Sequence, residues 1–221
     1  MKTNSSSRRA FVGTLAAGAS GLLAVPGNTL GGTKNESSSN DADAWFDKVK
    51  GSHRIVYDAS EPHNGFPMIW TWVFYTTNNQ TGSADNDLTA VVVLRHNAIP
   101  YAMEDRLWAT YKLGEFFKIN DNHTSAPAVR NPLWVPKEKD YPLPGIDGIK
   151  SLQDRGAMFC VCDMAIKVLS GFAAKGSGLD PEVVRKDWLS GILPGVQVVP
   201  SGVWAIGRAQ EKGCAYCYAG G

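Results

Sequence analysis

The feature that most constrains the fold is one unbroken apolar run, Ala90-Val91-Val92-Val93-Leu94. A half-exposed strand alternates apolar and polar residues, whereas a strand covered on both faces is apolar throughout. The three consecutive valines also favour extended backbone, because β-branched side chains pack well on a pleated surface. The run therefore predicts an inner strand of a parallel sheet with helices on both faces.

The chain on either side of this run alternates strand-like and helix-like segments. Strands are predicted at 54–58, 88–94, 158–162, 195–200 and 214–218. Helices are predicted at 66–76, 103–117, 149–154, 163–172, from 181 onward, and at 203–212. Ser60 is a candidate cap for the first of these helices, and Asp180 before Pro181 is a strong helix start. Alternation at this spacing predicts an α/β domain with a five-stranded, mainly parallel sheet.

Residues 1–27 have the pattern of an export signal. Arg8-Arg9-Ala10-Phe11 precedes a modestly apolar run of small residues, Val12 to Val25, which ends at Pro26-Gly27. A paired arginine before such a run is typical of a twin-arginine signal, and a general secretory signal that happens to carry two arginines is the alternative. The run is shorter than the roughly 20 apolar residues of a membrane-spanning helix. We therefore expect a periplasmic or exported protein with no membrane association beyond this segment.

Two stretches differ in composition from the rest of the chain. Residues 28–44 are rich in Gly, Ser, Asn and Thr and are predicted to be a disordered linker, so that the folded domain spans 45–221. A Pro-rich insertion occupies about 120–148 and carries five prolines, Pro127, Pro132, Pro136, Pro142 and Pro144. Loops of this length are usually functional or act as interaction arms, and a surface wrap without chemistry is the alternative.

Charge and motifs exclude several classes of function. The formal net charge of the 221 residues is +1, which gives no reason to expect nucleic acid as a partner. No G-x-G-x-x-G or P-loop follows a predicted strand, so a nucleotide enzyme is disfavoured and no cofactor can be assigned. Ser201 lacks the G-x-S-x-G elbow of a serine hydrolase.

Ligands of open parallel sheets bind at the carboxyl ends of the strands, which selects Asp58, His96, Cys162 and Ser201 as candidates. Cys162 is the first choice for a reactive sulfur, because the positive end of the helix that follows it favours a thiolate. The carboxylate of Asp163 opposes this effect. His96 is the candidate partner of the thiolate or a metal ligand. The alternatives are that Cys162 is a small core residue and His96 a hydrogen-bonded loop residue.

The other three cysteines have weaker signals. Cys160 lies two residues before Cys162 on the same strand, so both point to one face and packing is the favoured role for Cys160. Cys214 and Cys217 have the spacing of a redox or zinc motif, but within a strand they point to opposite faces. A four-cysteine zinc or iron–sulfur site therefore requires strand distortion or several subunits, and is kept as a minor hypothesis.

The last third of the chain resembles the DsrE/DsrF-like sulfur-relay family. The similar segments are 152–162, which ends at Cys162, the strand-to-helix turn Val198-Val199-Pro200-Ser201-Gly202-Val203, and 209–216; 91–96 is similar more loosely. The resemblance implies a flavodoxin-like three-layer domain that assembles into homo-oligomers. It also implies sulfur transfer through a persulfide on a loop cysteine, a position that Cys162 takes here.

Two functions from different classes follow. The first is an exported sulfur- or thiol-handling protein, with Cys162 as persulfide or redox thiol and a thiol or sulfur-carrier partner. The second is a non-enzymatic oligomeric binding or assembly module, with metal binding through the cysteines as a variant. The aromatic-rich helix at 70–74 and the Pro-rich insertion motivate this second function.

Overall fold

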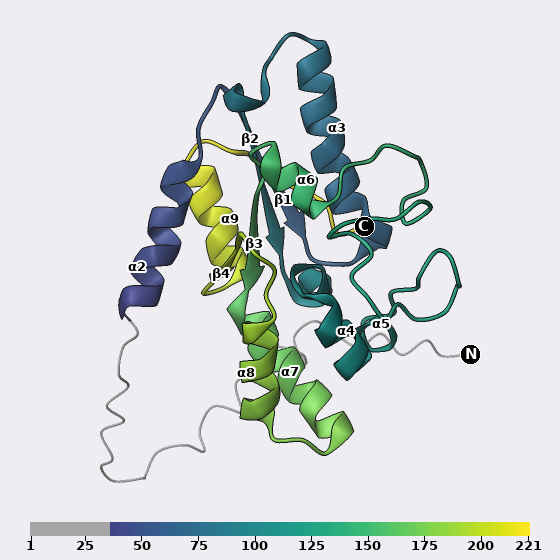
Figure 1. Cartoon of the computed structure of the whole chain (residues 1–221). Coiled ribbons are helices and arrows are strands. Elements are labelled where there is room, and N and C mark those ends of the chain that lie inside the picture. Colours follow the sequence, from purple (N-terminus) through teal and green to yellow (C-terminus); the bar gives the residue numbers. More distant parts are fainter. Residues whose placement is uncertain (1–35) are drawn as a thin grey trace, which may run out of the picture. The chain divides into compact units, whose positions relative to one another are not determined.

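The computed structural model describes residues 36–221, and its fold is a parallel sheet between two layers of helices (Figure 1). The five strands are β1 (His53–Ala59), β2 (Leu88–Leu94), β3 (Met158–Cys162), β4 (Val196–Val199) and β5 (Ala215–Tyr218), in the order β4-β3-β2-β1-β5. All four pairings are parallel. The predicted flavodoxin-like α/β architecture is confirmed.

The α-helices of the described chain are α2 (Glu36–Trp45), α3 (Phe66–Gln80), α4 (Asp105–Tyr111), α5 (Leu113–Phe116), α6 (Ile149–Asp154), α7 (Asp163–Ser177), α8 (Pro181–Ser190) and α9 (Gly202–Glu211). Short 3₁₀ turns are η1 (Phe46–Lys48), η2 (His63–Gly65), η3 (Asp85–Asp87) and η4 (His96–Ala102). No helix among the described residues is long and apolar enough to cross a membrane.

Each face of the sheet has its own apolar core. The first core packs α3, α4, α6, α7 and α8 against β1, β2 and β3. The second packs α2 and α9 against the opposite face, and Figure 1 shows these two helices side by side. The connections from β1 through β4 each add the next strand on the same side of the previous one. The connection from β4 to β5 runs back across the sheet and places β5 beside β1. Because parallel crossovers are right-handed, the returning helix α9 lies on the opposite face.

Strand β2 lies at the centre of the sheet and is buried along its whole length, as its composition predicted. Alternate residues serve the two cores: Val92 and Leu94 belong to the first, and Val91 and Val93 to the second. An inner parallel strand with apolar side chains on both faces is therefore confirmed.

The linker prediction is wrong over residues 36–44, which belong to helix α2. Ala42, Trp45 and Phe46 recur at the spacing of one helical face and are buried in the second core. Their signal is hidden by the polar residues around them, so composition alone suggested disorder. The predicted export signal at 1–27 and the linker residues 28–35 lie outside the described residues.

The helix predicted at 103–117 is two short helices, because Lys112 adopts a left-handed conformation with φ of 48°. The turn lets Gly114 meet the backbone of Ala128, where a side chain on residue 114 would collide with the Ala128 carbonyl. The cap predicted for α3 is also wrong: Gly65 occupies the N-cap position with φ of 81°, and the Ser60 hydroxyl lies 3.3 Å from the Tyr218 hydroxyl.

The Pro-rich insertion contains no helix or regular strand, as predicted, but it packs firmly on the domain. Buried Asn131 donates hydrogen bonds to the backbone carbonyls of Tyr101 and Met103, each 2.9 Å long. Ala128 and Leu133 from the same insertion belong to the first core. The insertion is therefore part of the domain's surface rather than a free arm.

Candidate functional site

The order of the strands places a switch point between β3 and β4. Chain leaving β3 enters α7 on one face of the sheet, and chain leaving β4 enters α9 on the other face. Ligands of open parallel sheets bind where neighbouring strands diverge in this way, outside their carboxyl ends. Cys162 pairs with Val199 at this point, so the sequence-selected cysteine lies at the edge where chemistry is expected.

Cys162 ends β3 and caps the next helix. Its sulfur accepts a hydrogen bond of 3.3 Å from the backbone N–H of Ala165, at the first turn of the 15-residue helix α7. The N-terminus of a helix carries roughly half a positive charge, which stabilises a thiolate over a thiol. Cys162 exposes only 6% of its surface. The sulfur is therefore hydrogen-bonded at the N-terminus of a helix and nearly buried.

The carboxylate beside Cys162 is neutralised by an arginine from α8. Both oxygens of Asp163 accept from the Arg185 guanidinium, at 2.8 and 3.0 Å. Asp163 was expected to oppose a thiolate at Cys162, and the ion pair reduces that opposition. The other terminal nitrogen of Arg185, Nη1, is buried and has no hydrogen-bond partner among the described residues.

Ser201 caps α9 on the opposite side of the switch point. Its hydroxyl accepts from the backbone N–H of Trp204 at 3.3 Å. Gly202 follows, and a side-chain carbon there would lie 2.6 Å from Cβ of Arg95. The Ser-Gly pair therefore has a structural reason: the serine starts the helix, and the glycine lets its first turn approach the stem of Arg95.

The ring of His96 forms a hydrogen bond with Glu61 and none with Cys162. Its Nδ1 forms a 2.8 Å hydrogen bond with Glu61, which follows β1, whereas Cys162 lies on β3 at the other side of β2. Asn97 donates to the second oxygen of Glu61 at 2.9 Å. The imidazole is 59% exposed, and His96 has φ of 50°. The structure therefore joins His96 to a carboxylate and does not bring it to the thiol.

A buried ion pair at the same edge contains Asp58, which sequence reasoning selected, and Arg95, which it missed. Asp58 is 3% exposed and accepts from Arg95 Nε at 2.6 Å and Nη2 at 2.9 Å. The hydroxyl of Tyr216 donates to Asp58 at 2.9 Å. The hydrogen bond with Asp58 raises the pKa of Arg95, while burial and then the same carboxylate raise the pKa of Tyr216. The available signal for the pair was an acid near the end of β1 and an arginine directly after the neighbouring strand β2.

The remaining cysteines are separated by the sheet. Cys160 and Cys214 belong to the second core, whereas Cys217 packs against the first. Burial raises the pKa of the Cys160 thiol well above its ordinary range and that of Cys214 to about 11. Among residues 36–221, no group of three or more His, Cys, Asp or Glu side chains is arranged to hold a metal ion. The hypothetical four-cysteine site is thus not formed within the described part of one chain.

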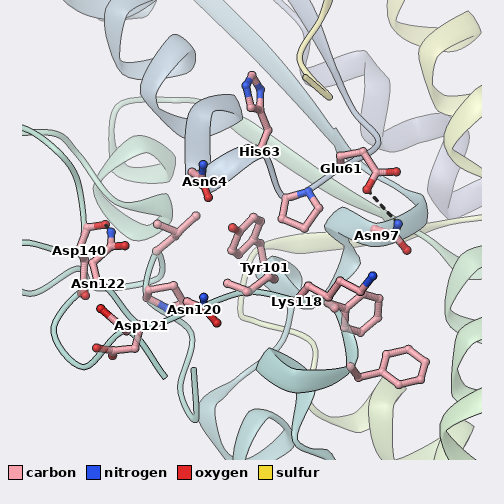
Figure 2. Close-up of a pocket in the computed structure, with 17 residues that line it drawn as sticks. Glu61, His63, Asn64, Asn97, Tyr101, Lys118, Asn120, Asp121, Asn122 and Asp140 are labelled. Carbon is pink, nitrogen blue, oxygen red and sulfur yellow. Dashed lines mark hydrogen bonds between the residues drawn. The ribbon is translucent and has the colours of Figure 1, made fainter. Parts of the chain in front are cut away.

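A cavity of about 690 Å³ opens at the β1 and β2 side of the same edge (Figure 2). Its walls come from Glu61–Asn64 after β1, from Asn97 and Tyr101 of η4, and from 116–122, Ser125, Pro132, Leu133 and Asp140. Cys162 and His96 are not part of the walls. Sequence reasoning missed this cavity because the insertion that closes it has no periodic pattern, and its length was the only signal.

Comparisons with known proteins assign no family. No family model matches the chain, and no curated protein matches it. One solved structure that is similar is the protein of unknown function MTH1491 from Methanobacterium thermoautotrophicum. It has 18% sequence identity and a TM-score of 0.40, over 76% of this chain and 99% of that one. A likeness at this level carries no argument about fold or function, so the site rests on its own geometry.

Proposed function

We propose that the chain is an exported, DsrE-like protein that handles sulfur or thiols, with Cys162 as the reacting sulfur. The observation that carries this proposal is the hydrogen bond from the Ala165 N–H to the Cys162 sulfur at the start of α7, beside the switch point of the sheet. Of the four cysteines, Cys162 is the one that combines a strand end with a helix N-terminus. These are the surroundings in which protein thiolates are stabilised.

The reaction that fits this site is transfer of a sulfane sulfur. The Cys162 thiolate attacks the terminal sulfur of a hydropersulfide or polysulfide donor, and a new S–S bond forms at Cys162. The S–S bond of the donor breaks, and the donor leaves as a thiolate with the electron pair of that bond. No net oxidation occurs. The Ala165 N–H donates to the Cys162 sulfur at the start of α7, and Arg185 holds the neighbouring Asp163 carboxylate in an ion pair.

Accessibility selects the donor. Because Cys162 exposes 6% of its surface, a linear donor such as a polysulfide reaches it more readily than a bulky disulfide. A protein donor needs local opening at the corner between β3 and α7. His96 has no role in this step, because its ring is held by Glu61 on the other side of β2.

The test is sulfur uptake by the reduced chain. Wild type, Cys162→Ser and the matched control Cys217→Ser are incubated with inorganic polysulfide, and intact masses are compared before and after reduction. We expect wild type and Cys217→Ser to gain reducible sulfur at Cys162, and Cys162→Ser to gain less, with any sulfur that it carries confined to the partly exposed Cys217. Equal uptake by Cys162→Ser, or no uptake by folded wild type, would refute the proposal.

A second candidate, an oligomeric binding or assembly module, is favoured by one separate observation. Met164, Val168 and Phe172 recur every four residues along α7 and are each about half exposed or more. Leu179 and Val183, around the start of α8, are also exposed. Contiguous exposed apolar side chains often mark contact surfaces. Light scattering after size exclusion tests this candidate: a homo-oligomer that Phe172→Glu dissociates supports it, and a monomeric wild type counts against it.

A further inference from the structure

The cavity of about 690 Å³ at the β1 and β2 side of the sheet is separate from the proposed thiol site. It lies between the segment after β1 and the Pro-rich insertion, and Cys162 is not among its walls. The insertion is anchored there by the hydrogen bonds of buried Asn131. A volume in the range of roughly 300–1,000 Å³ is typical of small-molecule sites. The cavity is therefore large enough for an organic ligand.

Backbone strain is concentrated in the walls of this cavity. Seven non-glycine residues of the described chain have positive φ, and four of them line it: His63, Asn64, Lys118 and Ser125, at 41°, 49°, 56° and 57°. Side chains disfavour this conformation, which persists where the surrounding structure holds it and is enriched at binding sites. The walls are thus held in a defined shape.

The three carboxylates of the walls are already engaged by protein groups. Glu61 is bound by His96 and Asn97, and Asp121 accepts from the backbone N–H groups of His123 and Thr124. Asp140 accepts from Arg130 and from the backbone N–H of Lys137, both at 2.6 Å. These acids have little capacity left for a metal ion or an ammonium group. A cationic ligand is therefore disfavoured.

The free polar groups are of a different kind. Lys118 forms no ion pair with any described residue. The side-chain amides of Asn64 and Asn120 form no hydrogen bond with any described residue. Figure 2 shows these three side chains around the ring of Tyr101. The partly exposed Phe116 adds apolar surface. The cavity thus offers one ammonium group, two amides that both donate and accept, and the imidazole of His63, whose buried Nδ1 has no hydrogen-bond partner among the described residues.

We propose that the cavity binds a small polyhydroxylated carboxylate, a sugar acid of about monosaccharide size. The ligand carboxylate pairs with the Lys118 ammonium, which has no protein partner to displace. Hydroxyl groups match the amides of Asn64 and Asn120, because both kinds of group donate and accept hydrogen bonds. The carbon-bound hydrogens of the ligand pack on Phe116, which is 38% exposed. This binding is independent of Cys162.

The experiment is calorimetric titration of the full chain with three probes: gluconate, glucose and acetate. Gluconate carries both the hydroxyl groups and the charge, so we expect it to bind, and glucose and acetate each to bind at least about tenfold more weakly. Lys118→Asn removes the charge but keeps a residue that tolerates positive φ. We expect it to weaken gluconate binding by about tenfold or more, as for loss of one charge-assisted hydrogen bond.

Lys112→Asn is the matched control, because Lys112 is also an exposed lysine with positive φ and does not line the cavity. It should bind gluconate as wild type does. Asn120→Ala is the second cavity variant and should also weaken binding. Gluconate that does not bind, that binds no better than acetate, or that binds Lys118→Asn as well as Lys112→Asn overturns the proposal. Cys162→Ser should leave binding unchanged, so this proposal and the thiol proposal fail separately.

Discussion

Removal of the Arg95 guanidinium should leave a buried carboxylate almost alone. Asp58 is 3% exposed, and two of its three side-chain hydrogen bonds come from Arg95, whose side chain is 27% exposed. In Arg95→Met only the Tyr216 hydroxyl remains as partner. Breaking a buried pair in this way typically costs about 3–5 kcal/mol. Because Arg95 is partly solvated, we expect about 3 kcal/mol at neutral pH, near the lower end.

Urea unfolding monitored by circular dichroism measures this loss as a lower midpoint at an unchanged slope. Arg106→Met is the matched control, because Arg106 also pairs with carboxylates, Glu104 and Asp187, but is 44% exposed. Arg106→Met should lower the free energy of unfolding by less than about 1 kcal/mol.

The double variant Asp58→Asn/Arg95→Met removes both charges. Its loss of unfolding free energy should be smaller than the sum of the losses in the two single variants. If Arg95→Met is no less stable than Arg106→Met, or if the two single losses simply add, then the ion pair does not stabilise this edge of the sheet as described.

Three further predictions follow from the packing and the charges. In native protein, Cys160 and Cys214 should label with iodoacetamide more slowly than Cys217 at mildly alkaline pH, because both are buried whereas Cys217 is partly exposed. Burial raises the pKa of all three thiols, so the difference depends on access. Peptide mapping would contradict this if Cys160 or Cys214 labels as fast in native protein as in urea. Gly202→Ala should lower the free energy of unfolding by about 1–3 kcal/mol, because the new Cβ meets the stem of Arg95. Gly207→Ala on the same helix has open space around its Cβ and should not destabilise the fold. Equal urea midpoints for the two variants would argue against the contact at Gly202. The Arg155 guanidinium holds the pKa of Asp85 below its ordinary value, so this pair stabilises the fold above about pH 4 and the contribution is lost as pH falls through the lowered pKa. The urea midpoint of Arg155→Met should therefore fall less than that of wild type between about pH 5 and pH 2, and an unchanged acid slope would show that the pair does not titrate as described.

The elements that sequence reasoning located well carry their signal locally. The apolar run of β2, the apolar segment of β3 and the Asp180 cap before Pro181 each depend on neighbouring residues. Asp180 accepts from the backbone N–H groups of Glu182 and Val183, as its position predicted. Such features can be predicted from sequence because residue propensity, hydrophobic pattern and burial in the folded domain all favour the same structure.

The features that sequence reasoning missed depend on contacts between distant segments. Helix α2 is stabilised by packing against the second core, which its polar composition does not reveal. The break at Lys112 is required by the approach of Ala128 to Gly114, from an insertion without periodicity. His96 forms its hydrogen bond with Glu61 from a left-handed backbone conformation, which is enriched for histidine but still too uncommon to be predicted from residue type alone.

The most direct test of the thiol proposal is to locate the sulfur atom after exposure of the folded full chain to polysulfide. Persulfides are trapped by alkylation, and each of the four cysteine positions is read by peptide mass spectrometry. We predict that the added sulfur is found at Cys162, with Cys160 and Cys214 unmodified. Sulfur carried only by Cys217, or an unmodified Cys162 in protein that remains folded, would contradict the assignment of Cys162 as the reacting group.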